Sequence, residues 1–437
     1  MGLSLFNAMP LAIRALWRDL TEANLSLYLV GGAVRDILSV SEQADPHDWD
    51  FAVGATPEAV TALSEALGYQ VVPSGLRFGT VTILTDAGGV EITTFRRDGA
   101  YTDGRHPATV HPASSIEEDL ARRDFTINAI ALTWDGTVID PFGGRKDIEN
   151  RILRAVGDPL TRFYEDPLRV WRAARFAGRG WRLNSATRQA AQVASPRLSL
   201  ISRERQRDEL MKGLASPQVG LFLEAVEDLD TLDVLWPEWA ALPEPVTACA
   251  FAVAGTPLAV PPWLRLAGLL HGLVVHDGEK ARRPDAVNGL RRVTWISATA
   301  LLERLALDGA TTERIAAVLD TQDFPWDTAT GADLRGLLRH LGPLTESIWL
   351  FRRMLESQGV YAPTGAARQS HIQGILSAGV APLAVSGRDI MQRFGLKPGP
   401  TVGRWLAFLR DQVDADPTRN QRDSLFAIVD TAMMRKD

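Results

Sequence analysis

The first third of the chain alternates short apolar runs with turn residues, a pattern that predicts strands. Four runs are rich in β-branched and aromatic residues: LSLYLV (25–30), WDFAV (49–53), GTVTILT (79–85) and VEITTF (90–95). The first run ends in a glycine pair, after which AVRDILSV (33–40) takes up helical spacing. We therefore predict a mixed sheet with helices up to about residue 150.

Beyond residue 150 the strand pattern nearly disappears, and apolar residues recur at helical spacing. The clearest helical segments are ISRERQRDELMKGL (201–214), VGLFLEAVEDL (219–229) and AVNGLRRVTWISATALLERLAL (286–307). Two proline clusters (242–245 and 257–262) and a polar stretch (357–371) are candidate hinges. The predicted fold class is α+β, with an N-terminal mixed sheet followed by an all-α remainder.

Composition places the chain among globular proteins of several modules. At 437 residues it is too long for one compact core, and its 46% hydrophobic and 23% charged residues exclude bulk disorder. The most apolar region is interrupted by prolines and Arg265, so we expect no membrane span. The single cysteine, Cys249, cannot form an internal disulfide, which fits a reducing cytoplasm as well as other settings. We expect a cytoplasmic protein.

Charge is distributed unevenly along the chain. The formal net charge is -6, which by itself argues against a nucleic-acid partner. Between Arg151 and Lys212, however, fourteen Lys or Arg residues stand against six Asp or Glu residues. Because charge acts locally, this segment is able to face phosphates.

A pair of aspartates marks the start of the second predicted strand. Asp48 and Asp50 are two residues apart, so their carboxylates project from the same face. Carboxylate oxygens suit hard divalent cations such as Mg²⁺, which in phosphoryl transfer activate the attacking hydroxyl and stabilise the leaving oxygen. A D-x-D alone is more often a solvated strand end or turn, so the pair needs support from neighbouring residues.

The glycine pair Gly31-Gly32 lies between a predicted strand and a predicted helix. Such a unit leaves room for a phosphate and directs backbone N–H groups and a helix N-terminus at it. Arg35, in the first turn of that helix, is placed to reach the same anion. The alternative is an ordinary glycine turn with a surface arginine. Glu91, in a neighbouring strand, is either a third acid near the metal or an edge charge.

The stretch EDPLRVWRAARF (165–176) combines an acid with arginines on one helical face. Asp166 before Pro167 is a good helix N-cap, and three arginines follow three residues apart: Arg169, Arg172 and Arg175. Cytosine and adenine both present an exocyclic amine beside a ring-nitrogen acceptor. An aspartate that accepts from the amine and an arginine that donates to the ring nitrogen therefore select C and A against U and G. Capping and base reading coexist at Asp166 only if different lone pairs serve them.

Six motifs in order resemble those of the class II tRNA nucleotidyltransferases, to which the bacterial poly(A) polymerases are close relatives. They are GGAVRD (31–36), the D-x-D at 48–50, RRDFTINA (122–129), DPFGGRKD (140–147), EDPLRVWRAARF (165–176) and SRERQRDEL (202–210). The segments 385–406 and 420–425 are similar to the tail of that family. The resemblance implies four parts: a nucleotidyltransferase head (1–150), a neck that recognises the base (151–215), and a helical body (216–310) and tail (311–437) that bind tRNA.

The resemblance also implies an activity and a site. Members of the family add CCA, or part of it, to tRNA 3′ ends from CTP and ATP, release pyrophosphate, and use Mg²⁺. Asp48 and Asp50 would be catalytic and hold the metal, and Asp166 and Arg169 would act as the template. The remaining nucleotide-binding residues would be Gly31, Gly32, Arg35, Arg123, Arg172 and Arg175.

Several alternatives stay open on the sequence. Arg122 and Arg123 are able to pair with the acids at 117–119 instead of binding phosphate, and Asp124 and Asn128 are expected to brace the turn. The segment 93–110 resembles a flexible loop that is shortened in enzymes adding only CC. Addition of CCA, addition of the terminal A alone, poly(A) synthesis, and RNA binding by an inactive head are all compatible with these motifs.

Overall fold

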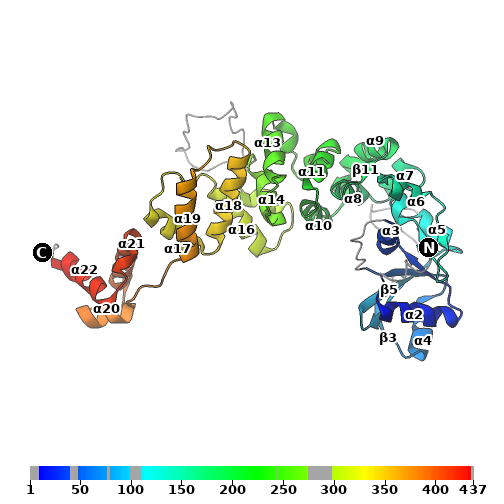
Figure 1. Ribbon diagram of the computed structural model, residues 1–437, viewed down its shortest axis with the longest axis horizontal. Helices are drawn as coiled ribbons and strands as arrows, with labels where there is room; N and C mark the ends of the chain where they lie inside the picture. Colours follow the sequence, from blue (N-terminus) through cyan, green and yellow to red (C-terminus); the bar gives the residue numbers. More distant parts are fainter. Residues whose placement is uncertain are drawn as a thin grey trace. The chain divides into compact units, whose positions relative to one another are not determined.

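The computed structural model describes residues 9–39, 48–75, 79–98, 110–242, 244–273 and 298–434. The chain forms two compact units (Figure 1). The first comprises residues up to 241 together with 304–306, and the second comprises 242–303 and 307–437. The boundary between them falls at the first predicted hinge, the proline cluster at 242–245.

The first unit begins with a mixed sheet, as the sequence predicts; residues up to 150 are called the head below. Its seven strands have the order β3-β4-β5-β2-β1-β8-β9. Within the described sheet, β2 and β5 pair in parallel and the other neighbours are antiparallel. The strands are β1 (Leu27–Val30), β2 (Asp50–Val53), β3 (Gln70–Gly75), β4 (Thr80–Thr85), β5 (Gly88–Thr94), β8 (Ala131–Leu132) and β9 (Val138–Ile139). All four predicted strands are confirmed.

The helices and ribbons of the head connect these strands. A core cluster that includes Val30, Ala52, Phe95, Leu120 and Ala131 joins strands β1, β2 and β8 to a neighbouring helix. The helical segments are α2 (Leu11–Glu22), α3 (Gly32–Leu38), α4 (Pro57–Ala66), α5 (Ile116–Ala121), η2 (Thr126–Asn128) and α6 (Gly144–Glu149). A two-stranded ribbon, β6 (Arg96–Asp98) with β7 (Val110–Pro112), follows β5.

The rest of the first unit is almost entirely helical. It contains α7 (Pro159–Glu165), α8 (Leu168–Ala177), α9 (Ser185–Ala194), η3 (Ser195–Leu200), α10 (Arg203–Leu214), α11 (Val219–Asp228), α12 (Thr231–Leu235) and η4 (Trp239–Ala241). Two short parallel strands, β10 (Ile152–Leu153) and β11 (Arg182–Leu183), were not predicted because two residues carry no period. Trp171 of α8 is fully buried and contacts Phe222 of α11.

The second unit is all α in the part that the structure describes. Its helices are α13 (Glu244–Ala254), α14 (Pro262–Leu270), α15 (Ala298–Glu303), α16 (Gly309–Asp320), α17 (Gly331–Leu341), α18 (Leu344–Ser357), α19 (Ala366–Ala378), α20 (Gly387–Phe394), α21 (Pro400–Ala415), η6 (Pro417–Arg419) and α22 (Arg422–Met434). Helices α20 to α22 pack around a core of their own, centred on Ile390, Leu409 and Leu425. The third predicted hinge is wrong for residues 366–371, which are helical in α19.

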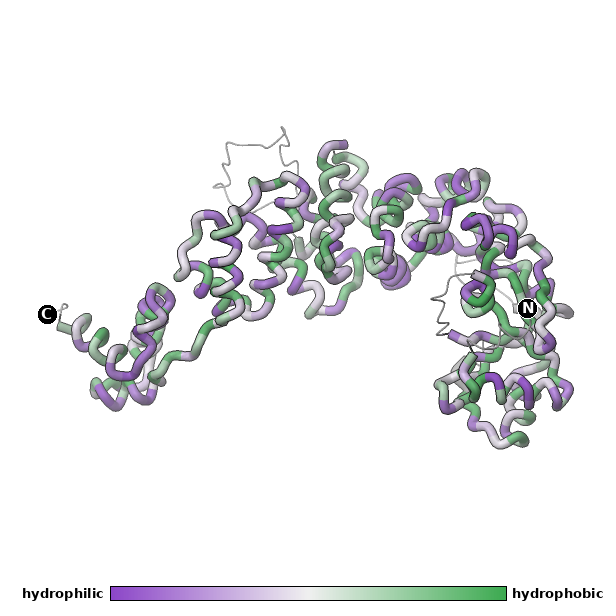
Figure 2. The backbone as a smooth tube through the Cα atoms, viewed as in Figure 1, coloured by the Kyte–Doolittle hydropathy of each residue, from purple (hydrophilic) through white to green (hydrophobic). Residues whose placement is uncertain are grey.

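The helical pattern and its punctuation agree with the sequence. Figure 2 shows hydrophobic and hydrophilic segments alternating along the helices of both units, as expected for helices that bury one face. Capping boxes begin α17, through Thr330 and Asp333, and α20, through Ser386 and Asp389. The prediction of an α+β chain is confirmed.

The DPFGG motif forms the turn that leads into α6. The Asp140 carboxylate accepts from the backbone N–H groups of Gly144 (2.7 Å) and Arg145 (2.9 Å). Gly143 adopts φ 72°, a left-handed conformation that favours glycine. A Cβ on Gly144 would lie 2.2 Å from the Thr126 carbonyl oxygen, so α6 approaches the turn of the preceding motif as closely as backbone atoms allow.

Replacing Gly144 by alanine is expected to destabilise the first unit. Because the new methyl group would meet a backbone oxygen, α6 has to move, and overpacking of this kind costs about 1–3 kcal/mol. Thermal unfolding of G144A should therefore begin at a lower temperature. Gly220, inside α11, is the matched control: a Cβ there meets nothing within 4 Å, so G220A should be neutral or stabilising. Equal stability of G144A and the unchanged protein contradicts the packing argument.

Candidate functional site

Strand register brings the first two motifs together. Asp50 opens β2, where it pairs with Val30 of β1 on one side and with Glu91 of β5 on the other. Asp48 lies just before β2 and is exposed. Gly31 follows Val30 directly, so the glycine turn and the aspartate pair meet at one end of neighbouring strands. Glu91 is the fourth residue of β5, which begins two residues before the predicted run.

Gly31 lies between the Asp50 carboxylate and the Arg123 guanidinium. Its φ is 76°, and a Cβ added to it would lie 3.3 Å from Arg123 Nη1 and 3.8 Å from Asp50 Oδ2. A side chain here would fill the space between the carboxylate and the guanidinium. The turn therefore has two reasons to be glycine, its backbone conformation and the need to keep this space open. A carboxylate, a guanidinium and a helix N-terminus converge on it.

The electrostatics around Asp50 fit a cation. Burial, followed by the neighbouring carboxylates of Glu91 and Asp48, raises the pKa of Asp50, while Arg123 opposes the increase. Like charges held this close disfavour ionisation unless a positive charge joins them. Within the described ranges, no group of three or more His, Cys, Asp or Glu residues is placed to hold a metal alone. Asp48 and Asp50 would thus need further oxygen ligands, such as those of a triphosphate.

Arg35 lies at the start of α3 and is 8% exposed. Its Nε donates to Asp36 and its Nη1 donates to Asn128 Oδ1 over 2.8 Å. The guanidinium also stacks on Phe176 of α8, with Cζ 5.4 Å from the ring centroid. Arg35 therefore links the glycine turn to the helix that carries the predicted base-reading residues.

Both arginines of RRDFT pair with one buried acid. Arg122 Nη2 lies 2.8 Å from Asp119 Oδ1 and Arg123 Nη2 lies 3.2 Å from Asp119 Oδ2. Burial would raise the pKa of Asp119, but the two guanidinium groups lower it. The pairing alternative is thus confirmed for Asp119. Arg123 keeps a second role open, since its Nε is buried without a hydrogen-bond partner among the described residues while its Nη1 faces Gly31.

Asp124 and Asn128 brace the same turn, as the sequence predicts. Asp124 Oδ1 accepts from the Phe125 N–H and from Asn128 Nδ2, and its Oδ2 accepts from Arg172 of α8. Burial alone would raise the pKa of Asp124, but Arg172 and the hydrogen bond from Asn128 hold it well below its ordinary range. The carboxylate is therefore ionised in the folded protein and ties the head to α8.

This shift predicts how stability changes with acidity. A depressed folded pKa contributes stability above the unfolded value of about 3.9, and that contribution is lost as the pH falls through the folded value. D124N should be less stable than the unchanged protein by roughly 1.5–3 kcal/mol at pH 7, the contribution of hydrogen bonds to charged groups. Urea unfolding should show this gap narrowing below about pH 4. D86N, in the exposed turn after β4, is the control, and a gap independent of pH contradicts the assignment.

Asp166 lies at the start of α8 with part of its carboxylate uncommitted. Its Oδ1 accepts from the Leu168 N–H over 3.1 Å, and its Oδ2 accepts from Arg205 of α10 over 3.2 Å. The first contact holds the Leu168 N–H as a capping carboxylate does, but α8 begins at Leu168 with Pro167 as its N-cap, so the predicted N-cap position of Asp166 is wrong by one residue. A carboxylate has about four lone-pair sites, so two remain for a ligand.

Arg169 is anchored beside Asp166, and its backbone N–H donates to the Asp166 carbonyl over 3.0 Å. Nη1 donates to the Arg162 carbonyl (2.7 Å) and to Glu165 (2.9 Å), and Nη2 donates to the Arg122 carbonyl (3.0 Å). Three of the five guanidinium N–H groups are thereby used, which leaves two donors for a ligand. The template pair of the sequence prediction is therefore adjacent, fixed in place and incompletely satisfied.

The other two arginines of α8 are held by acids on either side of it. Arg172 pairs with Asp124 of the head, and Arg175 Nε donates to Glu209 of α10 over 2.5 Å. Arg175 is 9% exposed, and its Cζ lies 5.3 Å from the Phe176 ring centroid. These contacts explain part of the local excess of arginine, since the residues fix α8 between the head and α10.

Two family models match the chain over the regions just described. Residues 27–154 match the Poly A polymerase head domain, and residues 180–242 match the probable RNA and SrmB-binding site of polymerase A. The first match covers the sheet, the glycine turn and the aspartate pair. The second covers all of α9, α10, α11 and α12.

Two bacterial CCA-adding enzymes match nearly the whole chain. The CCA-adding enzyme of Levilactobacillus brevis is 33% identical over 430 residues, which are 95% of this chain and 96% of the relative. The chain belongs to the class II tRNA nucleotidyltransferase family. The CCA-adding enzyme of Lactiplantibacillus plantarum is 31% identical over 435 residues, 98% of this chain and 96% of the relative. The crystal structure of the Bacillus stearothermophilus CCA-adding enzyme in complex with CTP superposes with a TM-score of 0.70 at 27% identity, and covers 99% and 98% of the two chains.

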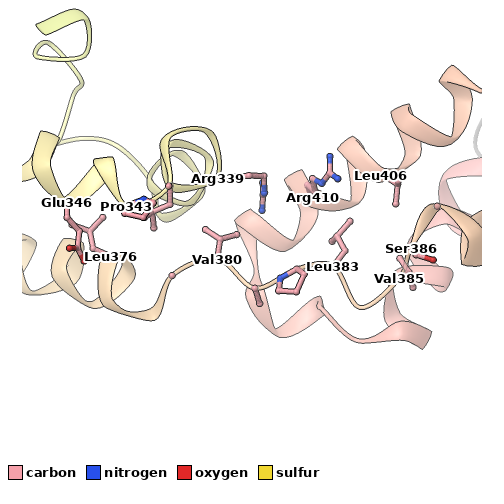
Figure 3. Close-up of a pocket in the computed structure, with 16 residues that line it drawn as sticks. Arg339, Pro343, Glu346, Leu376, Val380, Leu383, Val385, Ser386, Leu406 and Arg410 are labelled. Atoms are coloured by element: carbon pink, nitrogen blue, oxygen red, sulfur yellow. The ribbon is translucent and has the colours of Figure 1, made fainter. Parts of the chain in front are cut away.

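All ten predicted site residues of this class II tRNA nucleotidyltransferase lie in its first unit. A separate cavity of about 970 Å³ lies in the second unit, between the α17–α18 connection, the segment before α20, and α21 (Figure 3). Arg339, which lines it, pairs with the buried Asp414. None of the predicted site residues lines this cavity.

Helix α10 carries two residues whose contacts the sequence did not reveal. Arg205 contacts Asp166 and Glu209 contacts Arg175 of α8, although the sequence assigned no role to the SRERQRDEL motif. The helical spacing of that motif is the signal that places both residues on one face of α10. Residues 99–109 of the predicted flexible loop lie outside the described residues. Across the described part of this nucleotidyltransferase, none of the helices has the length and apolar character needed to cross a membrane, in agreement with the prediction.

Proposed function

We propose that the protein adds the CCA sequence to tRNA 3′ ends from CTP and ATP, with release of pyrophosphate. The observation that supports this most directly is the match to CCA-adding enzymes over 95–98% of the chain. The match runs through the second unit, so it favours a tRNA-binding chain and not a catalytic head alone. The use of CTP is supported by the superposed Bacillus stearothermophilus structure, which is a complex with CTP.

The head is proposed to carry out the transfer. Asp48 and Asp50 would hold Mg²⁺, which when bound activates the terminal hydroxyl of tRNA and stabilises the leaving oxygen. Gly31 and Gly32 leave space for the triphosphate, and Arg35 and Arg123 supply positive charge beside it. The tRNA 3′ oxygen then bonds to the α-phosphorus as the bond to pyrophosphate breaks.

Asp166 and Arg169, at the start of α8, are proposed to select the base. Asp166 accepts from the amine of cytosine or adenine, and Arg169 donates to the adjacent ring nitrogen. Each has hydrogen-bonding capacity left after its contacts within the protein. Uracil and guanine present a carbonyl and an N–H there, and the buried mismatch disfavours them. Arg172 and Arg175 act by holding α8, given their acid partners.

The remaining assignments follow from the family. Residues 1–150 are proposed as the catalytic head and 151–215 as the base-reading neck, with 216–310 and 311–437 binding tRNA by shape and phosphate contacts. Bacterial relatives and a tRNA substrate favour a cytoplasmic location.

The test uses two tRNA substrates, one ending before CCA and one ending in CC. Purified full-length protein is given Mg²⁺ with CTP, with ATP, or with both. Full CCA addition extends the first substrate by three residues only when both nucleotides are present, and extends the second with ATP alone. Extension of the CC-ended tRNA only would restrict the activity to the terminal A. A long adenylate tail would identify a poly(A) polymerase, and no incorporation would leave RNA binding as the function.

A further inference from the structure

Arg205 of α10 contacts the carboxylate that the proposed function uses to read the base. Its Nη2 lies 3.2 Å from Asp166 Oδ2. The exposed fractions of the two side chains are 24% and 19%, so neither is sealed from a ligand. Arg205 lies 39 residues beyond Asp166 in sequence and stands on a different helix from Arg169.

Neighbouring contacts fix the position from which Arg205 reaches α8. The Trp171 indole N–H donates to Gln206 Oε1 over 3.3 Å, and Arg175 Nε donates to Glu209 Oε2 over 2.5 Å. Gln206 also donates to the carbonyls of Leu198 and Ile201. Helix α10 therefore meets α8 at three successive levels, and the one nearest the start of α8 is the Arg205 contact.

One donor of Arg205 is unused within the protein. Its Nη1 is buried and has no hydrogen-bond partner among the described residues. A buried donor without a partner is unfavourable, so a ligand atom that accepts a hydrogen bond from Nη1 would stabilise this arrangement. A bound nucleotide would bring acceptor atoms to this carboxylate, because Asp166 is proposed to hold the exocyclic amine of the base.

Resting on the proposed function, we infer that Arg205 is a positioning residue for base selection. Its Nη2 fixes the orientation of the Asp166 carboxylate, so that the lone pairs left by the Leu168 N–H and by Arg205 point at the amine of C or A. Its Nη1 completes the site by donating to the bound nucleotide. Without Arg205 the carboxylate keeps its cap but is free to turn about its side-chain torsions.

The inference predicts a loss of selection in place of a uniform loss of activity. In R205A, the ratio of kcat/KM for ATP and CTP over GTP and UTP should fall about tenfold or more, since a charged hydrogen bond orders the reading group. R205K keeps the charge but has no planar pair of donors, so it should fall between R205A and the unchanged protein. Affinity for tRNA should not change in either variant.

The control is R203A, on the same helix. Arg203 is exposed and donates a long hydrogen bond to the Val234 carbonyl (3.4 Å), so R203A removes the same charge without altering the contacts of Asp166. Its nucleotide ratios should match those of the unchanged protein. If R205A unfolds, R205K and R205Q carry the measurement, and an unchanged ratio in both overturns the inference. A uniform decrease with all four nucleotides likewise identifies Arg205 as merely structural.

The same experiment separates failure of the inference from failure of the proposed function. If the unchanged protein incorporates neither CMP nor AMP into tRNA, the proposed function is wrong. If it does, but D166A selects nucleotides normally, the template assignment is wrong. If D166A loses selection and the Arg205 variants retain it, the role of Arg205 alone is rejected.

Discussion

Replacing Asp50 by alanine is expected to reduce CMP and AMP incorporation into tRNA by about a thousandfold or more. A metal ion contributes several kcal/mol of transition-state stabilisation, and each 1.36 kcal/mol corresponds to a factor of ten in rate. Asp50 is central to this, because it lies between Val30 and Glu91 in the sheet and close to Gly31. Asp48→Ala should act in the same direction. Single-turnover extension of tRNA at saturating Mg²⁺ measures both effects.

The fold and tRNA affinity of these variants distinguish a chemical defect from a structural one. Removing Asp50 relieves repulsion from Glu91 and Asp48, so D50A should be at least as stable as the unchanged protein. Its dissociation constant for tRNA should not change. D86N, which alters an exposed turn, should retain full activity. Full activity in D48A or D50A would remove that residue from the metal site.

Replacing Asp166 by alanine is expected to weaken discrimination against GTP and UTP about a hundredfold. The carboxylate is proposed to accept from the cytosine 4-amine or the adenine 6-amine, where uracil and guanine carry a carbonyl, and a mismatched polar edge is rejected by up to roughly 10⁴–10⁵ when the site is intact. Arg169 remains in place in this variant through Arg162, Glu165 and Arg122, so part of the discrimination should persist. Competition between ATP and GTP on a CC-ended tRNA measures the ratio directly.

A second helix cap supplies the control for Asp166. Asp158 begins α7 and its Oδ2 accepts from the Thr161 N–H over 2.8 Å, so D158A loses a comparable cap outside the reading pair. Either variant should lose about 0.5–2 kcal/mol of stability. Only D166A should lose discrimination. Matching selectivity in D158A and D166A would reduce Asp166 to a capping residue.

The elements that sequence reasoning found are those with a strong local period or turn. The strands ending at Val30 and Val53 carry β-branched and apolar residues, and Gly31 predicts the turn between strand and helix. The sequence singled out Asp50 and Gly31 as separate motifs, and the register of β1 and β2 brings them together. Local chemistry and family resemblance agree there.

What sequence reasoning missed depends on pairing between distant segments. Nothing within EDPLRVWRAARF shows that Arg172 and Arg175 are held by Asp124 and Glu209, which are 48 and 34 residues away. The partner of Asp166 is equally distant, because Arg205 lies on another helix. Side-chain pairs of this kind are set by how helices pack, and a single-sequence pattern does not specify that packing.

The adjacent residues Arg122 and Arg123 contact the two halves of the proposed nucleotide site. The Arg122 carbonyl holds Arg169, which is proposed to read the base, while the Arg123 guanidinium faces the glycine turn proposed to receive phosphate. Two adjacent residues, with Cα atoms about 3.8 Å apart, therefore position groups at both proposed ends of the nucleotide. A shift of this backbone segment would therefore move both contacts together, so the proposed base and phosphate ends of the site are mechanically coupled.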